Sequence, residues 1–393
     1  MPFILFIMSL VTDAILEKLN SLIVVVNHHG KVEYVSPSAK RILGFEPEQL
    51  MGEGWWNLTR IDELERADIK ALTLQQLKQD SLIESVPYER LLKTATGGDK
   101  WILWNTSKGP SNTLVGIGHD ITDRKKAEQK LLEKNKELEQ HNKDMVDSIQ
   151  YASRIQEAIL PDINKLKTVF DDAFVLYQPK DVVSGDYYFF YQRGSKTFVA
   201  AVDCTGHGVP GALMSFIANG ILKEVIIKKG VEEPSEILYA LDDELFTALN
   251  KQNSEGITND GMDVALAVFD LEKNTVNYSG AFRPMLLLRD NELIEFDANR
   301  YPIGFYGDVE KIFVSKEMEF KKDDTFYFFT DGYCDQFGGE LKKKFNRKRF
   351  KELLLSLQGM EMDEQQSFLK YVLLNWRQEE PQMDDILVMG IKV

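Results

Sequence analysis

The chain has few cysteines and a shortage of basic residues, and both features narrow the classes of protein to which it can belong. Its 393 residues include only Cys204 and Cys334, too few for a disulfide framework, and no histidine–cysteine cluster has the spacing of a zinc site. The net charge of -15 argues against general nucleic-acid binding, because such binding needs a basic face. We therefore expect a cytoplasmic, soluble protein with no nucleic-acid partner.

Long apolar runs are missing as well. The first ten residues, MPFILFIMSL, are apolar, but a helix that spans a bilayer needs about 20 such residues. The same segment lacks the basic region and the small-residue cleavage site of a signal peptide. We expect it to be a packing or dimerising segment and expect no membrane span, so that a membrane role would need a partner.

Length and composition divide the chain into three blocks, at 1–124, 125–162 and 163–393. In the first block, LIVVVN and KVEYVS predict two strands on either side of a turn at His29-Gly30. PSAKRILGF has helical spacing and stops at Gly44, and WILWNTS and TLVGIGHDIT predict further strands. The first block is therefore expected to be an α/β domain.

The second block is charged, contains no glycine and shows a seven-residue repeat. The two inward series are Leu131, Leu138, Met145, Ala152 and Ile159, and Asn135, Asn142, Ile149 and Gln156. This repeat predicts a coiled coil and hence a homodimer, with the asparagines fixing register at some cost in stability. A single solvated linker helix is the alternative.

The third block contains clusters of strands and clusters of helices. The predicted strands are FVLYQP, DYYFFYQR, TFVAAVD, VALAVFDL, TVNYSG, PMLLLRD, TFYFFTDG and DILVMGIKV. The predicted helices are GALMSFIANGILKEVI, SEILYALDDELFTALN, KRFKELLLSL and EQQSFLKYVLLNW. Clustering of this kind favours an α+β fold of antiparallel sheets flanked by helices over a regular parallel array.

Four aspartates of the third block lie beside these strands or beside glycine turns: Asp186, Asp203, Asp331 and Asp384. Carboxylates at strand ends suit hard divalent cations, which prefer oxygen ligands. Two such ions could share a bridging water, lower its pKa and clamp a phosphoryl oxygen. The sequence has no GxSxG, HExxH, Walker A or kinase glycine-rich motif, so metal-assisted phosphoester hydrolysis is the reaction class that fits.

Six motifs of the third block resemble, in the same order, those of the metal-dependent protein serine/threonine phosphatases (PPM), in their bacterial SpoIIE-type branch. They are PKDVVSGDYYFF, AVDCTGHGVPGALMS, DGMDVALAVFD, YSGAFRPMLLLRDNEL, FTDGYCDQFGG and QMDDILVMGIKV. The resemblance implies an αββα sandwich of antiparallel sheets that binds two Mn2+ or Mg2+ ions. It also implies a protein substrate, for which a STAS-type anti-anti-sigma factor is the natural expectation.

The resemblance assigns metal-binding roles to five positions. Asp186 matches the first metal ligand and Asp203 the ligand that bridges both ions, while Cys204 would offer its main-chain carbonyl. Asp331 matches the aspartate of the TDG motif and Asp384 the last ligand, although the adjacent Asp385 is easily confused with it.

Other residues in the motifs keep two interpretations. His207 is either a proton donor to the leaving serine or a residue that shapes the loop. Arg283 and Lys180 are candidate phosphate contacts or, alternatively, solvated surface charges. Asp263 and Asp335 are expected to be structural.

The first block resembles a PAS sensor domain, through LIVVVNHHGKVEYVSPSAKRILGFEPEQLMG and the exit strand GIGHDITDRKKAEQKL. No cysteine precedes Cys204, which excludes a flavin–cysteinyl adduct, and the lack of histidine between His29 and His119 disfavours a haem ligand there. Trp55, Trp56, Trp101 and Trp104 either line a ligand pocket or pack in the core. The PAS ligand stays unknown.

The order of sensor, coiled coil and phosphatase implies a signal-regulated enzyme. The alternative is a non-catalytic dimeric signalling scaffold on a phosphatase fold, which the full aspartate set opposes. A sensor histidine kinase would share the first two blocks, but the asparagine and glycine boxes of its ATP-binding domain are absent from the sequence.

Overall fold

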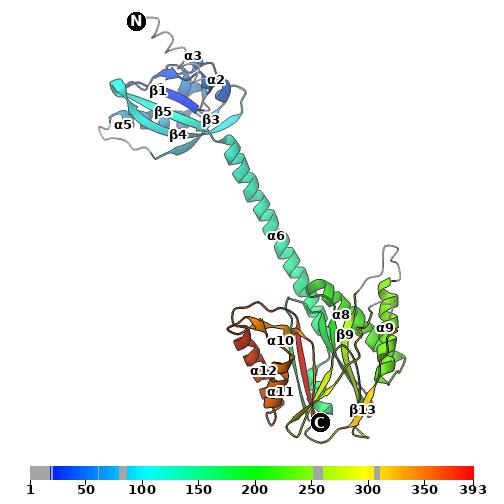
Figure 1. Cartoon of the computed structure of the whole chain (residues 1–393). Coiled ribbons are helices and arrows are strands. Elements are labelled where there is room, and N and C mark those ends of the chain that lie inside the picture. Colours follow the sequence, from blue (N-terminus) through cyan, green and yellow to red (C-terminus); the bar gives the residue numbers. More distant parts are fainter. Residues whose placement is uncertain (1–17, 19–20, 61, 79–85, 251–259, 305–309) are drawn as a thin grey trace. The chain divides into compact units, whose positions relative to one another are not determined.

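The computed structural model describes the chain except for residues 1–17, 19–20, 61, 79–85, 251–259 and 305–309 (Figure 1). The apolar segment at residues 1–10 therefore lies outside the described residues. The chain forms two compact units, Met1–Asn142 and Lys143–Val393. Each unit has its own hydrophobic core.

The first unit is built on one five-stranded antiparallel sheet with the order β2-β1-β5-β4-β3. Its strands are β1 (Ser21–Val26), β2 (Val32–Val35), β3 (Tyr88–Lys93), β4 (Asp99–Gly109) and β5 (Thr113–Asp120). Helices α2 (Ser38–Leu43), α3 (Pro47–Leu50), α4 (Gly54–Leu58) and α5 (Glu63–Lys78) lie between β2 and β3 in the chain. A 3-10 turn at Pro110–Asn112 joins β4 to β5.

Local sequence signals explain this arrangement. Alternate residues of β1 are buried, because one face of the strand packs against the core. Gly44 ends α2 in the left-handed conformation, with φ of 80°, where its amide donates to the carbonyl of Lys40. The expected strands at residues 22–27, 31–36, 101–107 and 113–122 and the expected helix end at Gly44 are all confirmed.

Helix α6 (Thr122–Ile159) forms where the heptad repeat predicts a helix. Leu131, Leu138 and Met145 of the first inward series are 63%, 58% and 63% exposed. Gln156 differs from the expectation, because it is 3% exposed and contacts its own chain instead of facing a helical partner. The stripe open to a second helix therefore ends before Gln156.

The second unit contains two five-stranded antiparallel sheets, with the orders β13-β10-β9-β8-β7 and β12-β11-β14-β17-β6. The first comprises β7 (Asp186–Arg193), β8 (Lys196–Cys204), β9 (Met262–Asp270), β10 (Thr275–Ala281) and β13 (Lys316–Glu319). The second comprises β6 (Asp172–Gln178), β11 (Met285–Arg289), β12 (Glu292–Phe296), β14 (Thr325–Phe329) and β17 (Ile386–Lys392). A small hairpin pairs β15 (Phe337–Gly338) with β16 (Lys343–Lys344).

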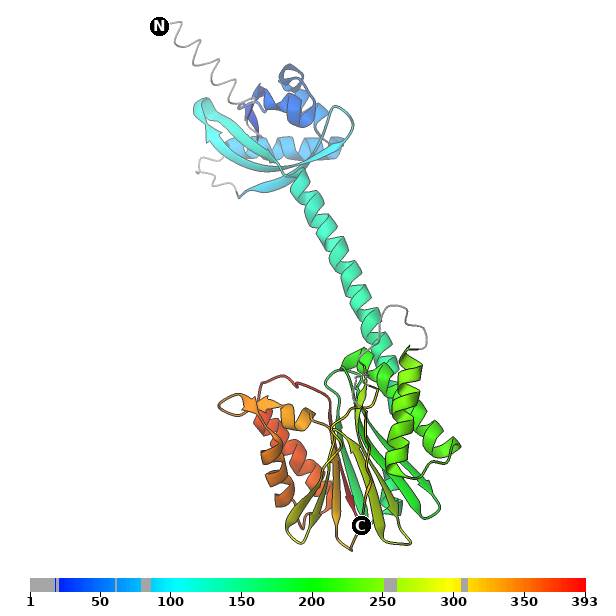
Figure 2. The ribbon, with the colours of Figure 1, turned by 45° about the vertical axis from the view of Figure 1, so that its right-hand side comes forward.

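Helices cover the outer face of each sheet, so that the layers run helix, sheet, sheet, helix (Figures 1 and 2). Beside the first sheet are α8 (Gly208–Lys223), a π-helical turn at Glu224–Lys228 and α9 (Pro234–Asn250). Beside the second are α11 (Arg347–Ser356) and α12 (Met362–Arg377), while the short helices α7 (Ile163–Val169) and α10 (Gly332–Asp335) flank strands of that sheet. The expected αββα sandwich is confirmed.

Alternating residues of β8 show how the layers form. Val199 and Ala201 face the core between the two sheets, whereas Ala200 and Val202 face the core under α8 and α9. Residues Gly208–Lys228 are long and apolar enough to cross a membrane by length and composition, but half of that stretch is buried. Its buried side packs against β7 and β8, as expected of a core helix.

Two glycines in this unit should respond differently to an added methyl group. At Gly332, the first residue of α10, a Cβ atom would lie 1.9 Å from the carbonyl oxygen of Asp385, whereas at Gly220 of α8 it would meet nothing within 4 Å. We expect Gly332→Ala to lower the melting temperature in thermal unfolding, because backbone must shift. Gly220→Ala should leave it unchanged or raise it, since alanine is favoured over glycine inside a helix by about 1 kcal/mol. Equal melting temperatures for the two variants would contradict this packing.

Candidate active site

Antiparallel register brings three aspartates together at one end of the first sheet. Asp186, the first residue of β7, lies opposite Asp203 near the end of β8, and Asp203 lies opposite Asp263 near the start of β9. Asp331 and Asp384 come from the second sheet, directly before α10 and two residues before β17. Strand ends of both sheets thus contribute carboxylates to one region.

Arg283 joins the aspartates of the two sheets. Its Nη2 atom lies 2.5 Å from Asp203 Oδ2, 2.7 Å from Asp331 Oδ2 and 3.1 Å from Asp263 Oδ2. The Arg283 side chain is 14% exposed, and its buried Nε has no hydrogen-bond partner among the described residues. The structure thus places Arg283 among carboxylates; a phosphate contact by this residue stays a prediction.

The aspartates occupy a strongly negative environment. Burial, followed by the charge of Asp203, raises the pKa of Asp186 well above its ordinary value. Burial also raises the pKa of Asp203 to about 7 and that of Asp263 to about 6, although Arg283 opposes both shifts. One guanidinium does not offset this much negative charge, so the region favours cations.

Asp186 is the most enclosed member of the set, with 2% of its surface exposed. Thr330 Oγ1, at the end of β14, donates a hydrogen bond of 2.6 Å to Asp186 Oδ2. The Asp186 amide donates to Ser184 Oγ at 3.0 Å. The Thr330 bond fixes the carboxylate and connects the first sheet to the second, while the Ser184 bond holds the main chain of Asp186.

Asp384 and Asp385 differ clearly in their contacts. Asp385 is 3% exposed, and its two carboxylate oxygens accept from the amides of Lys180 and Gly185, each at 2.7 Å. Asp384 is exposed as a whole residue, although its carboxyl group is partly enclosed. This partial burial, and then the charge of Asp331, raise the pKa of the carboxyl. Asp385 therefore holds the loop before β7, and Asp384 is the one left available as a ligand.

The remaining expected site residues lie around this cluster. Cys204 is buried, and burial raises the pKa of its thiol well above the ordinary value, which leaves the main-chain carbonyl as its available ligand. A Cβ atom at Gly185 would lie 3.1 Å from that carbonyl oxygen, so the glycine permits close approach of the two loops. The His207 Nδ1 atom lies 3.0 Å from Asp181 Oδ2, and Lys180 contributes its amide to Asp385.

The donors suit a divalent cation by their chemistry, since all are oxygens from carboxylates and one main-chain carbonyl. In the described part of the chain, no group of three or more histidine, cysteine, aspartate or glutamate side chains is arranged so that it could hold a metal ion. Arg283 lies between Asp203 and Asp331 and uses their oxygens. The donor atoms are therefore of the type that binds a divalent cation. Arg283 would have to move away from Asp203 and Asp331 before these carboxylates could coordinate a metal ion.

Three features of the site were not identified from the sequence. The first is Asp263, which the sequence suggests is structural but which joins the cluster by its register opposite Asp203. Asp335, for which the sequence suggests the same, lies outside the cluster and pairs with Lys344 at 2.8 Å. Thr330 immediately precedes Asp331, but only the pairing of distant strands brings it to Asp186. The third is Gln156, which the heptad repeat places in a coiled-coil seam but which the structure buries against its own chain.

Gln156 connects the last turn of α6 to the loop that carries the site. Its Nε2 donates to the carbonyl of Ser184 at 2.6 Å and to Ser215 Oγ at 2.9 Å, and its Oε1 accepts from the amide of Ser184 at 3.0 Å. Ser184 is two residues before Asp186, and Ser215 belongs to α8. A displacement of this helix end would therefore act directly on the backbone next to Asp186.

Comparisons with known proteins agree with this architecture. Residues 193–393 match the family described as stage II sporulation protein E (SpoIIE), and residues 20–123 match a PAS domain. The SiaA-PP2C domain of Pseudomonas aeruginosa is 32% identical with a TM-score of 0.58, and the similarity covers 64% of this chain and 98% of that domain.

Two further proteins are similar over shorter shares. The PP2C phosphatase domain of SpoIIE from Bacillus subtilis, solved with a fragment of its regulatory domain, is 20% identical with a TM-score of 0.46, covering 56% of this chain and 62% of that one. The uncharacterized protein y4lL of Sinorhizobium fredii (strain NBRC 101917 / NGR234) is 32% identical over 122 residues, which is 29% of this chain. The match spans only 14% of the length of that curated relative.

The adjacent aspartates Asp384 and Asp385 can be separated by experiment. We expect Asp385→Asn to lower the free energy of unfolding by about 1–3 kcal/mol, because an amide NH2 would face a backbone donor that it cannot satisfy. Asp384→Asn should keep or raise the stability of the metal-free protein, since it removes one charge from a repulsive cluster. Urea unfolding in EDTA measures both, and a larger loss for Asp384→Asn would reverse the assignment.

Proposed function

The chain belongs to the SpoIIE family, with a PP2C-type phosphatase domain and a PAS domain, and on this premise we propose that it is a signal-regulated, metal-dependent phosphatase for phosphoserine or phosphothreonine on a protein partner. The observation that supports the proposal is the convergence of Asp186, Asp203 and Asp331 from two sheets. Asp384 is close enough for its charge to interact with Asp203 and Asp331. We propose the domain limits 1–124, 125–162 and 163–393, the last of which includes β6, a strand of the second sheet that precedes the family match.

Within the proposed site, Asp186, Asp203, Asp331, Asp384 and the carbonyl of Cys204 would hold two Mn2+ or Mg2+ ions. When bound, the ions would lower the pKa of the attacking water and offset charge on the phosphoryl oxygens. Thr330 keeps the Asp186 carboxylate in place, as its hydrogen bond of 2.6 Å indicates. Movement of Arg283 away from Asp203 and Asp331 would free a guanidinium for the phosphate.

His207 is suited to protonate the leaving oxygen. It precedes α8 as the N-cap residue, its side chain is 52% exposed, and Asp181 holds its Nδ1 atom at 3.0 Å. Its other nitrogen is then left for the substrate side. In the hydrolysis, the phosphorus–oxygen bond to the serine or threonine breaks, water adds to phosphorus, and the alcohol oxygen receives a proton.

The proposed partner rests on the motif resemblance, and the proposed assembly rests on the exposed face of α6. We propose a STAS-type anti-anti-sigma protein as the phosphoprotein, in keeping with the resemblance of the motifs to SpoIIE-type enzymes. The exposed stripe of Leu131, Leu138 and Met145 on α6 supports a homodimer formed by pairing of these helices. Both cysteines are unpaired and buried, which supports a reducing compartment such as the cytoplasm.

The proposed activity is tested by hydrolysis of p-nitrophenyl phosphate with Mn2+ and with EDTA. We expect turnover that requires the metal and that falls about 1000-fold or more in Asp203→Asn, because this carboxylate would help to hold the ions. Asp335→Asn is the matched control, since Asp335 pairs with Lys344 outside the cluster, and it should keep most of the activity.

Two results would contradict the proposed activity. Turnover that does not require a metal would show that the aspartates do not act as metal ligands in the reaction. A lack of both turnover and Mn2+ binding, in the full chain and in residues 163–393, would favour the non-catalytic dimeric scaffold.

Regulation through α6 predicts a specific effect of Gln156. Gln156→Leu keeps the helix and the side-chain size but removes three hydrogen bonds around Ser184 and Ser215. We expect at least about a tenfold change in metal-dependent kcat, since the buried groups left behind must rearrange beside Asp186. Gln140→Leu, at an exposed position of the same helix, is the control, and equal kcat values for the two variants would exclude control through this contact.

A further inference from the structure

The first unit contains a cavity between its sheet and the helices α4 and α5. Its volume is about 50 Å³, counted as space open to the centres of water molecules. A single water needs about 10–15 Å³ by this measure, so the cavity has room for several waters or a small organic molecule. Aromatic rings from Trp55, Trp56, Tyr88 and Trp104 form much of its wall.

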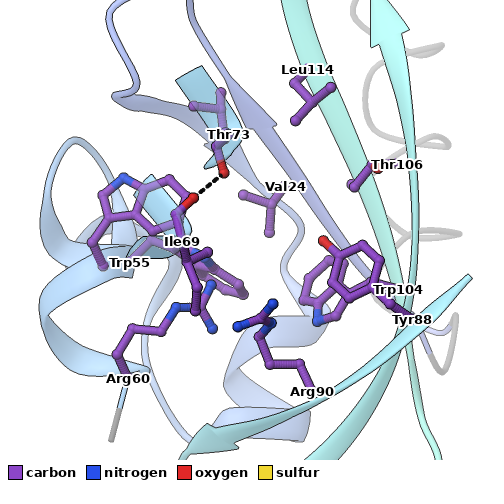
Figure 3. Close-up of a pocket in the computed structure, with 13 residues that line it drawn as sticks. Val24, Trp55, Arg60, Ile69, Thr73, Tyr88, Arg90, Trp104, Thr106 and Leu114 are labelled. Atoms are coloured by element: carbon purple, nitrogen blue, oxygen red, sulfur yellow. Dashed lines mark hydrogen bonds between the residues drawn. The ribbon is translucent and has the colours of Figure 1, made fainter. Parts of the chain in front are cut away.

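Two arginines point into this cavity from opposite sides (Figure 3). Arg60 follows α4 in the chain, and Arg90 lies on β3. In Figure 3 the two guanidinium groups lie close to each other. The rings of Trp55 and Trp104, which meet edge to face with centroids 5.7 Å apart, lie beside them in the wall. All described residues that line the cavity are neutral apart from these two.

Arg60 is buried, and two of its nitrogens have no hydrogen-bond partner among the described residues. It is 7% exposed, and its Nε and Nη1 atoms have no partner among the described residues. The guanidinium lies over the rings of Trp55 and Trp56, at 5.8 and 5.6 Å from their centroids. Stacking of this kind stabilises a cation but does not satisfy its N–H donors.

Glu65 compensates only part of the positive charge of the two arginines. In the described part of the chain Arg90 forms an ion pair with Glu65, which is 3.5 Å long and partly exposed, and its buried Nε has no partner there. Burial, and then the charge of Arg90, lower the pKa of Arg60 to about 10. Two cations that lie close together in a largely aromatic cavity are costly unless an anion joins them.

We propose that this cavity binds a small organic carboxylate with a flat apolar body. Arg60 and Arg90 hold the carboxylate with paired N–H donors, a geometry that suits guanidinium groups. Trp55, Trp56 and Trp104 enclose the apolar body. The aromatic wall favours an organic acid over a bare inorganic anion, because an inorganic anion would leave these rings without contacts.

The proposal is tested on the full chain with benzoate as the probe and benzamide as its neutral counterpart. Three of the tryptophans line the cavity, so binding is followed by tryptophan fluorescence and by the melting temperature. We expect benzoate to change the fluorescence and to raise the melting temperature, whereas benzamide and inorganic phosphate do neither. The proposal is overturned if benzoate has no effect at millimolar concentration, or if benzamide or phosphate binds as tightly.

Variants separate ligand binding from a packing role. Arg60→Met should weaken benzoate binding by about 10- to 100-fold, the range for a lost hydrogen bond to a charged group. In the absence of ligand it should melt at the same temperature or higher, because an unpaired buried charge is removed. Arg90→Met should weaken binding in the same way, and Arg41→Met, at an exposed position on α2, should not. The proposal is contradicted if Arg60→Met binds benzoate as tightly as the unchanged protein. If both cavity variants also melt at a lower temperature without ligand, the arginines serve only in packing.

Discussion

Repulsion among carboxylates at one end of the paired sheets constrains the rest of the second unit. Antiparallel register alone places Asp186, Asp203 and Asp263 on adjacent strands at the same level. Their raised pKa values show that this position disfavours charge, and Arg283 offsets only part of the effect. A divalent cation would need the same oxygens that Arg283 now uses, so metal binding and the position of this arginine are linked. The fold therefore has to hold the carboxylates firmly enough to resist their separation.

The two sheets resist that separation through hydrogen bonds that cross between them. Thr330 at the end of β14 donates to Asp186 of β7, and Asp385 before β17 accepts from the amides of Lys180 and Gly185. Gly332 lets α10 begin in contact with the Asp385 backbone, where no side chain fits. Each bond or contact pairs one position of the cluster with a neighbour from the opposite sheet or loop. The aspartates are thus positioned by neighbouring residues that lie outside the carboxylate cluster.

Local sequence pattern predicts most strands and long helices of the second unit and draws attention to the aspartates beside them, whose role as metal ligands stays a prediction. Apolar runs predict eight strands of the second unit. They do not predict β12 and β13, whose sequences ELIEF and KEME are interrupted by charged residues, or the two-residue strands β15 and β16. Asp263 was assigned to structure because only the pairing of β8 with β9 reveals that it faces Asp203. Gln156 has the spacing of a coiled-coil seam, and its burial against Ser184 depends on packing that no periodicity encodes.

Buried polar groups in the two units illustrate opposite solutions to the same physical cost. Gln156 uses both its amide atoms in bonds to its own chain, so the end of α6 is held in one position next to the site. Arg60 is also buried, but its Nε and Nη1 atoms lack hydrogen-bond partners among the described residues. A satisfied buried group rigidifies its surroundings, whereas an unsatisfied one lowers stability until a ligand supplies the missing acceptor. A signal-regulated enzyme needs both, because a sensor must gain free energy from its ligand, and a catalytic site must keep its geometry between signals.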